Sequence, residues 1–230
     1  MMSKLILNAE EEDFVFENEW DTAIPVSFTF TPGEGTVLTA FPQVEKEARA
    51  FLEKYDEEPT SDEALSFLFA QLAPHMARWG YQDDRFRDRW GYILRADASS
   101  VIPPASPLAV RLTEADEKGN ETTYDLEATC KAGCLAYGIK AAGRVVSLAV
   151  THEPPADCAG IVEVGVETAP AARGNGYATA CLAALTHDLL ASGYAVEYRC
   201  QRYNEASLRV ALGAGFRHVG KYYYYVGRRI

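Results

Sequence analysis

The sequence lacks a long apolar run and lacks an excess of basic residues. No hydrophobic stretch approaches the ~20 residues that a membrane-spanning helix requires, so a membrane is not an expected partner. Lysine and arginine number 22 against 33 aspartates and glutamates, which gives a net charge of −11. Nucleic acid is not expected either, because contacts to its phosphates need clustered Lys and Arg. The acidity suits a cationic substrate such as a protonated amine, or serves only to keep the protein dissolved.

Cysteine is scarce, and no targeting signal is apparent. The five cysteines are an odd number and widely spread, which is typical of free thiols in a reducing compartment. Cys130 and Cys134 have the spacing of half a metal site, but no second Cys/His pair matches them, so no metal is expected. The first residues have neither the apolar core nor the cleavage site of a signal peptide. Together these features predict a cytoplasmic protein.

Residues 1–107 differ in pattern from the rest and are expected to form an N-terminal α/β region. Strand patterns occur at 14–16 and 26–30, separated by proline and acidic turns. An apolar stripe predicts a helix over 44–55.

Three further segments complete this region. Thr60, with Glu63 three residues later, has the pattern of a capping box and predicts the start of a second helix. The charged residues within 79–95 are interpreted as one face of an amphipathic helix, with a substrate-binding patch as the alternative. The proline-rich segment 98–107 is a linker or crossover.

Residues 108–230 show strands and short turns followed by alternating helices and strands. The order strand, strand, strand, strand, helix, strand, helix, strand predicts a mixed sheet with helices packed on it. The fold class is therefore α/β, in the sense of an α+β mixed sheet. The expected strands are 108–112, 134–139, 145–150, 164–168, 195–200 and 216–226, with helices ending near 192 and beginning near 204.

The most informative segment is 164–180, where a β-branched strand leads through a glycine loop into an alanine-rich helix. Such a junction points several backbone N–H groups in one direction at the positive end of a helix dipole and can bind phosphate. Gly174 and Gly176 let the backbone approach a bulky anion. A third glycine of the dinucleotide fingerprint is missing, as is the Gly-Lys-Ser/Thr of a nucleoside-triphosphate loop. Two interpretations of the loop remain. It holds a pyrophosphate of another kind of ligand, or it is only a tight turn.

Two motifs resemble the GNAT acyltransferase superfamily. Residues 173–178 (Arg-Gly-Asn-Gly-Tyr-Ala) match its Arg/Gln-x-x-Gly-x-Gly/Ala signature, and 166–170 look like its fourth strand. Asn204 to Ser207, followed by Gly215-Phe216, is similar to its second motif on the next helix and strand. The resemblance covers about residues 108–230. It implies a GNAT-like acyl-CoA-binding catalytic domain and acetyl-CoA as the donor.

The resemblance also implies which residues bind acetyl-CoA. Val166 and Thr168 would offer backbone groups to the pantetheine arm. Asn204 would bond the cofactor near its thiol end, with Ser207 one helical turn later, although Asn204 also suits a plain helix cap. The N–H groups that would cradle the pyrophosphate belong to Arg173, Gly174, Asn175, Gly176, Tyr177 and Ala178.

The implied reaction is direct attack of a primary amine, on a small molecule or a peptide, on the thioester. A backbone N–H near Val166 would bind the oxyanion. Glu163 and Glu167 are candidates for the base and share one face of the strand, unless a family-type bulge reverses the alternation. Glu163 is the preferred base. None of the five cysteines has a histidine in a nucleophile motif, which favours a route without a covalent intermediate.

One position departs from the family pattern. Many members carry a tyrosine seven residues after the motif asparagine as the acid toward the thiolate, and here that position is Ala211. Tyr203 or a water would take that role. The departure also supports an alternative hypothesis, a non-catalytic acyl-CoA-binding or sensing module.

The acceptor side is left open by the sequence. Residues 1–107 are expected to form one wall of the acceptor site. The tyrosines 222–225 would line that site or simply pack in a sheet. The identity of the amine is not determined, and neither is the oligomeric state, with a homodimer among the options.

Overall fold

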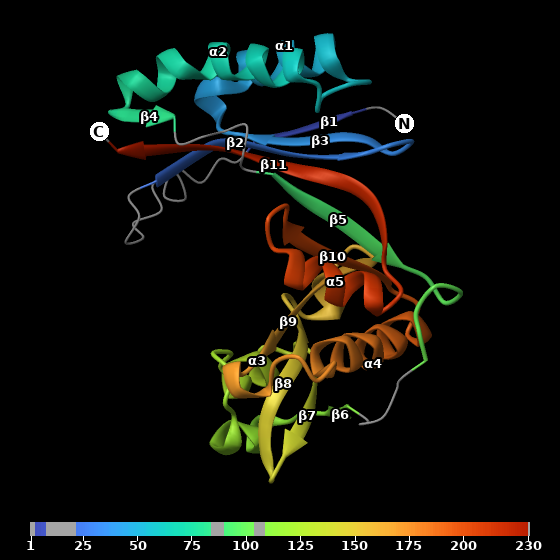
Figure 1. The fold of residues 1–230 in the computed structure, drawn as a ribbon. Coiled ribbons are helices and arrows are strands. Elements are labelled where there is room, and N and C mark those ends of the chain that lie inside the picture. Colours follow the sequence, from blue (N-terminus) through green and yellow to red (C-terminus); the bar gives the residue numbers. More distant parts are fainter. Residues whose placement is uncertain (1–2, 8–21, 84–89, 104–108, 230) are drawn as a thin grey trace. The chain divides into compact units, whose positions relative to one another are not determined.

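The protein is represented by a computed structural model that describes residues 3–7, 22–83, 90–103 and 109–229 (Figure 1). The chain divides into two compact units, Met1–Tyr92 with Val219–Ile230, and Ile93–His218. The strand expected at 14–16 lies outside the described residues. In the described part of the chain, no helix has both the length and the apolarity to cross a membrane.

The first unit is built on an antiparallel hairpin extended on both edges. Strand β2 (Thr22–Thr31) turns through Pro32–Glu34 into β3 (Gly35–Ala40). Strand β1 (Lys4–Leu7) adds to β3 in parallel, and β11 (Arg217–Arg229) adds to β2 antiparallel. The short β4 (Tyr81–Asp83) pairs with the last residues of β11.

Helices α1 (Glu45–Tyr55) and α2 (Asp62–Arg78) lie along one face of this sheet, as Figure 1 shows. Phe28 of β2 stacks on Tyr223 of β11 at 4.9 Å between ring centroids and meets Phe51 of α1 at 5.5 Å. Tyr223 and Tyr225 are both buried in this core. Burial raises the pKa of Tyr223 to about 12. Of the two interpretations of the tyrosine run, the structure favours sheet packing for these two residues.

The second unit holds the sheet order β10-β9-β8-β7-β6. All neighbouring pairs are antiparallel except β9 and β10, which are parallel. The strands are β6 (Val110–Arg111), β7 (Ala136–Ala141), β8 (Arg144–Thr151), β9 (Ile161–Thr168) and β10 (Ala195–Gln201). The helices are α3 (Leu126–Lys131), α4 (Tyr177–Ala191) and α5 (Glu205–Gly213), with short 3-10 turns at Glu114–Gly119, Pro155–Asp157 and Pro170–Ala172.

The two faces of this sheet are covered by different segments. Tyr137 of β7 forms a hydrogen bond with Asp188, so its face carries α4. The next residue, Gly138, faces the opposite way, where an added Cβ would lie 2.6 Å from Leu112. Leu112 belongs to a buried cluster that includes Leu126 of α3. Side chains alternate along a strand, so the residues of β8 and β9 can be assigned to the α4 face or the α3 face.

The mixed α/β sheet predicted from the sequence is confirmed, and several local expectations are corrected. Segment 79–95 is not a helix in its described residues, because α2 ends at Arg78 and is followed by β4 and by β5 (Trp90–Ala96). The cap of α2 is also one residue later than expected. Ser61, and not Thr60, accepts a hydrogen bond from the Ala64 N–H at 3.2 Å.

This cap generates a stability prediction. Ser61→Ala removes the acceptor for an unpaired N–H of the first turn and should lower the free energy of unfolding by about 1 kcal/mol. Thr60→Ala, the matched control, should change it by less than about 0.5 kcal/mol. Denaturant unfolding of both variants checks this, and an equal or larger loss for Thr60→Ala would restore the original assignment.

Candidate functional site

The edge of β9 is open along half of its length. β10 pairs with β9 only from Ala195 opposite Ile161 to Tyr198 opposite Val164. β8 continues to pair with β9 as far as Thr168. Within the described residues, the stretch 165–168 therefore has a strand partner on the β8 side alone. The point where β10 leaves β9 is where an extended ligand could add to the sheet.

The backbone groups that face this opening are those of Val166 and Thr168. The Glu163 carbonyl accepts from His152 on the β8 side, and the Ala169 N–H donates to Val146 on the same side. The pairing of β8 with β9 shows no register shift from Val164 to Thr168, so the alternation is unbroken. Even-numbered residues consequently direct N–H and C=O away from β8. The two residues expected to bond pantetheine have their backbone groups in the required direction.

The loop after β9 leads to a helix terminus that the protein does not neutralise. Gly174 has φ of 82° and Gly176 has φ of 75°, and a Cβ on either glycine would meet no atom within 4 Å. Gly176 caps α4 without any side-chain hydrogen bond, and the first turn of α4 holds no acidic residue. Each of the other four described α-helices has an acidic first turn, and three of them also have a side-chain cap. The positive end of α4 is thus left for an external anion.

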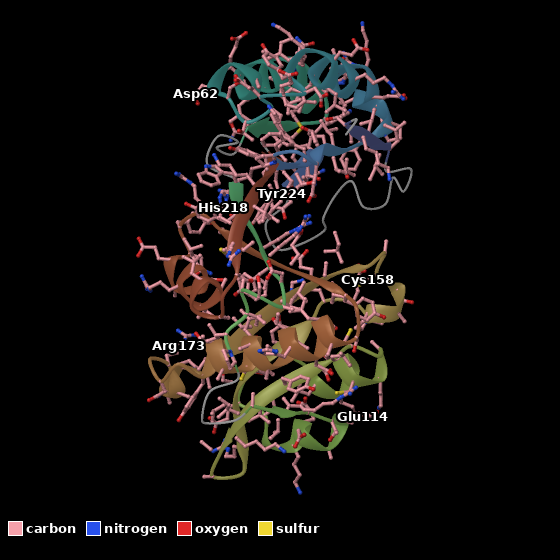
Figure 2. The ribbon with its side chains drawn as sticks, turned by 90° about the vertical axis from the view of Figure 1, so that its right-hand side faces the viewer. Asp62, Glu114, Cys158, Arg173, His218 and Tyr224 are labelled. Atoms are coloured by element: carbon pink, nitrogen blue, oxygen red, sulfur yellow. The ribbon has the colours of Figure 1, made fainter. Side chains whose placement is uncertain are left out.

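Two side chains fix the shape of this loop. The Arg173 guanidinium donates from Nε to the Thr168 carbonyl at 3.2 Å, and Figure 2 labels Arg173 beside the start of α4. The Asn175 amide donates to the Ala172 carbonyl at 3.0 Å and to the Arg173 carbonyl at 3.3 Å. Residues 173–176 are exposed. The strand end, the loop and the helix start are thereby joined into one continuous site.

The second motif is anchored at the start of α5. The Asn204 side chain accepts the Ser207 N–H at 3.1 Å, which is the helix-cap role considered as the alternative for this residue. That bond uses the amide oxygen and leaves the Nδ2 group able to donate elsewhere. The Ser207 hydroxyl lies 2.8 Å from the Tyr198 hydroxyl. Burial raises the pKa of Tyr198 to about 12, against the lowering effect of that hydrogen bond.

Ala211 and Tyr203, the two positions considered for the acid toward the thiolate, differ in their exposure to solvent. Ala211 of α5 is fully buried, and its methyl group has no proton to donate. Tyr203 lies in the turn after β10 and is 64% exposed. Tyr198 is the last residue of β10 that pairs with β9. Its hydroxyl lies on the same side of the sheet as α5.

The α3 face of β9 carries a separate polar cluster. The Glu163 carboxylate lies 3.4 Å from His152 Nδ1 and 3.3 Å from Arg199 Nε. Burial tends to raise the pKa of Glu163, but the His152 hydrogen bond and the Arg199 charge together hold it below its ordinary value. Glu167 lies on the same face and accepts from the Thr123 N–H at 3.0 Å and from its hydroxyl at 2.7 Å. Of the two glutamates, Glu167 is thus bonded to a loop and Glu163 to ionisable groups.

Gly165 separates these two glutamates and is covered by two ring side chains. A Cβ at this position would lie 2.6 Å from His152 Nε2 and 3.0 Å from the Tyr124 hydroxyl. Both groups therefore lie against the bare backbone of β9, at the first residue beyond the last β9–β10 pair. Burial raises the pKa of Tyr124, with a smaller contribution from the Glu167 charge.

Tyr124, His152 and Tyr198 are among the residues of this site that the sequence analysis missed. Gly165 was the available signal for the first two, because a lone glycine within a β-branched strand indicates a close approach by another group. No comparable signal marks Tyr198, whose place depends on the register of β10 against β9.

Comparison with known families identifies the domain. The GNAT acetyltransferase family model matches residues 128–225, which include β7 to β10, the glycine loop, α4 and α5. A comparison with curated proteins gave no match.

Solved structures share the fold. An acetyltransferase of the GNAT family from Novosphingobium aromaticivorans is similar with a TM-score of 0.51 and 24% identity, over 66% of this chain and 69% of that one. A GNAT acetyltransferase from Colwellia psychrerythraea has a TM-score of 0.51 and 12% identity, over 87% of this chain and 81% of that one. The open strand edge, the uncapped helix and the family match agree: residues 128–225 match the GNAT acetyltransferase family, and this match supports an acetyl-CoA-dependent N-acetyltransferase.

Proposed function

We propose that the protein transfers an acetyl group from acetyl-CoA to a primary amine of a small molecule or peptide. The observation that carries this proposal is the continuity of the open β9 edge with the uncapped start of α4. The first offers peptide-like hydrogen bonds to an extended amide-bearing arm, and the second offers a positive terminus to a pyrophosphate. The family generally uses acetyl-CoA, and the two features fit the two halves of that molecule.

The residues that would hold the donor are those of these two features. Val166 and Thr168 would pair with the pantetheine arm through their backbone groups. Asn204 would donate from Nδ2 near the thiol end, and Ser207 would act there together with the Tyr198 hydroxyl. The pyrophosphate would be held by N–H groups of Arg173, Gly174, Asn175, Gly176, Tyr177 and Ala178.

When bound, acetyl-CoA supplies an acetyl thioester. The Val166 N–H would stabilise the oxyanion, since it faces the opening and is fixed by the strand. Glu163, together with the ionisable side chains bonded to it, would remove the ammonium proton. Direct attack is supported by the cysteines, because Cys181 and Cys200 are buried and burial raises their pKa, that of Cys181 to about 12. A thiol in that state is a poor nucleophile.

The acceptor is proposed to be a cationic amine, in keeping with the net charge of −11. A cytoplasmic location is proposed because all five cysteines are free. The role of residues 1–107 as a wall of the acceptor site stays a prediction. A homodimer also stays open, and sedimentation measurements would decide it.

Donor binding is tested by thermal unfolding. At a concentration 100 times its Kd, acetyl-CoA should stabilise the protein by about 2.7 kcal/mol, with a matching rise in Tm. Gly174→Ala should weaken this shift, because it puts a Cβ in the loop and strains a φ of 82°. Gly193→Ala, at the far end of α4 with φ of 88° and equally open surroundings, is the matched control and should lose similar basal stability but keep the shift.

Three outcomes of this experiment carry different conclusions. No stabilisation of the wild type by acetyl-CoA or CoA would remove the donor assignment. Equal loss of the shift in both glycine variants would remove the loop from the site. A full shift without release of free CoA thiol across spermidine, an aminoglycoside and a peptide amine would instead support the non-catalytic binding module.

The source of the proton for the thiolate is tested with two tyrosines. Tyr203→Phe should lower kcat by about 10²-fold and remove the alkaline limb of its pH profile, because the acid must be protonated to act. The KM for acetyl-CoA should not change. Tyr198→Phe is the comparison, since it removes the hydroxyl bonded to Ser207. Loss of the alkaline limb in Tyr198→Phe alone would transfer the role to that residue, and its persistence in both variants would leave water as the acid.

A further inference from the structure

The cluster on the α3 face of β9 contains an imidazole arranged as an oriented base. His152 directly follows β8, and its N–H donates to the Glu163 carbonyl at 3.0 Å, which fixes the backbone. Its Nδ1 faces the Glu163 carboxylate at 3.4 Å. Among the described residues, no hydrogen bond engages Nε2. A carboxylate on one ring nitrogen and an available second nitrogen is the arrangement that holds a histidine in one tautomer for proton transfer.

The available nitrogen lies where the proposed reaction would take place. Nε2 would be 2.6 Å from a Cβ on Gly165, and Gly165 is the first residue beyond the last β9–β10 pair. The next residue, Val166, carries the proposed oxyanion donor. An amine approaching from the α3 face would therefore reach the opening of the sheet past the imidazole. The absence of a side chain at Gly165 is what allows the ring this position.

The environment of Glu163 favours a supporting role for this carboxylate. Arg199 and His152 hold its pKa below the ordinary value, despite burial. A carboxylate with a lowered pKa is a weak proton acceptor near neutral pH, but its charge stabilises an adjacent imidazolium. Among the described residues, the charged and titratable groups on this face are Glu163 and Glu167 of β9, Arg199 of β10 and Tyr124 before α3, and Glu153 follows His152 in the sequence.

We infer that His152 is the catalytic base of this acetyltransferase and that Glu163 is its positioning residue. The inference rests on the proposed function. His152 Nε2 accepts one proton from the acceptor ammonium and later releases it to water. The neutral nitrogen forms the C–N bond to the acetyl carbon as the C–S bond breaks. The second proton of that nitrogen ends on the departing thiolate, so one amide, one CoA thiol and one free proton are produced.

The pH profile separates His152 from Glu163 as the base. A base must be deprotonated, so kcat/KM of the wild type should rise with pH along an acidic limb. His152→Gln should lower kcat by about 10²–10⁴-fold and remove that limb, and added imidazole should partly restore the rate of His152→Ala. Glu163→Gln should keep the limb and lower kcat, because the imidazole loses the carboxylate that orients it through Nδ1. The assay uses CoA thiol release with the fastest amine among spermidine, an aminoglycoside and a peptide amine.

Two further variants test the position of the imidazole and control for the loss of a histidine in general. Gly165→Ala should push the imidazole aside and lower kcat, while the thermal shift with acetyl-CoA is retained. His218→Gln removes an exposed histidine of β11, labelled in Figure 2, and should leave the profile unchanged.

The outcomes distinguish this inference from the function on which it rests. A wild type that neither binds acetyl-CoA nor releases CoA would overturn both. An active wild type whose acidic limb survives in His152→Gln and disappears in Glu163→Gln would overturn the inference alone and make Glu163 the base. A parallel loss of the acetyl-CoA thermal shift in His152→Gln would also contradict it, because that result indicates a structural role.

Discussion

The site depends on one interruption in a ladder of backbone hydrogen bonds. β9 and β10 pair as far as Val164 and Tyr198 and then separate, while β8 continues beside β9. Backbone N–H and C=O groups rarely remain without partners once they are enclosed. The parting of the two strands therefore leaves the backbone groups of Val166 and the N–H of Thr168 for an extended ligand, while the Thr168 carbonyl already accepts from Arg173. A continuous sheet at this point would have had no room for a substrate.

The proposed donor requires local positive potential, and the start of α4 can provide it without a basic patch. The chain is strongly acidic, yet the N-terminus of α4 has neither an acidic first turn nor a side-chain cap. Backbone dipoles therefore provide local positive potential inside a protein of net negative charge. The overall acidity would favour the cationic acceptor that we propose. Donor and acceptor can thus be attracted by different parts of the electrostatic field.

Local chemistry was predictable from the sequence, and cross-strand relations were not. The loop at 173–178 and the cap at Asn204 depend on neighbouring residues, so their patterns are visible in the chain. Ser61 was confused with Thr60 because both residue types cap helices and only the backbone geometry distinguishes them. The places of His152 and Tyr198 depend on which residues face each other across β8, β9 and β10. That register is set by packing between distant segments, and no short window of sequence contains it.

Residue-resolved amide hydrogen exchange with and without CoA tests directly whether the ligand pairs with the open edge of β9. Odd-numbered residues of β9 direct their N–H groups to β8, whereas Val166 and Thr168 face the opening. CoA should therefore slow exchange at Val166, at Thr168 and in the loop 174–178. It should change exchange little at Gly165 and Glu167, whose amides β8 already protects. Equal protection of odd and even positions, or none along β9, would contradict a ligand paired with the open strand edge.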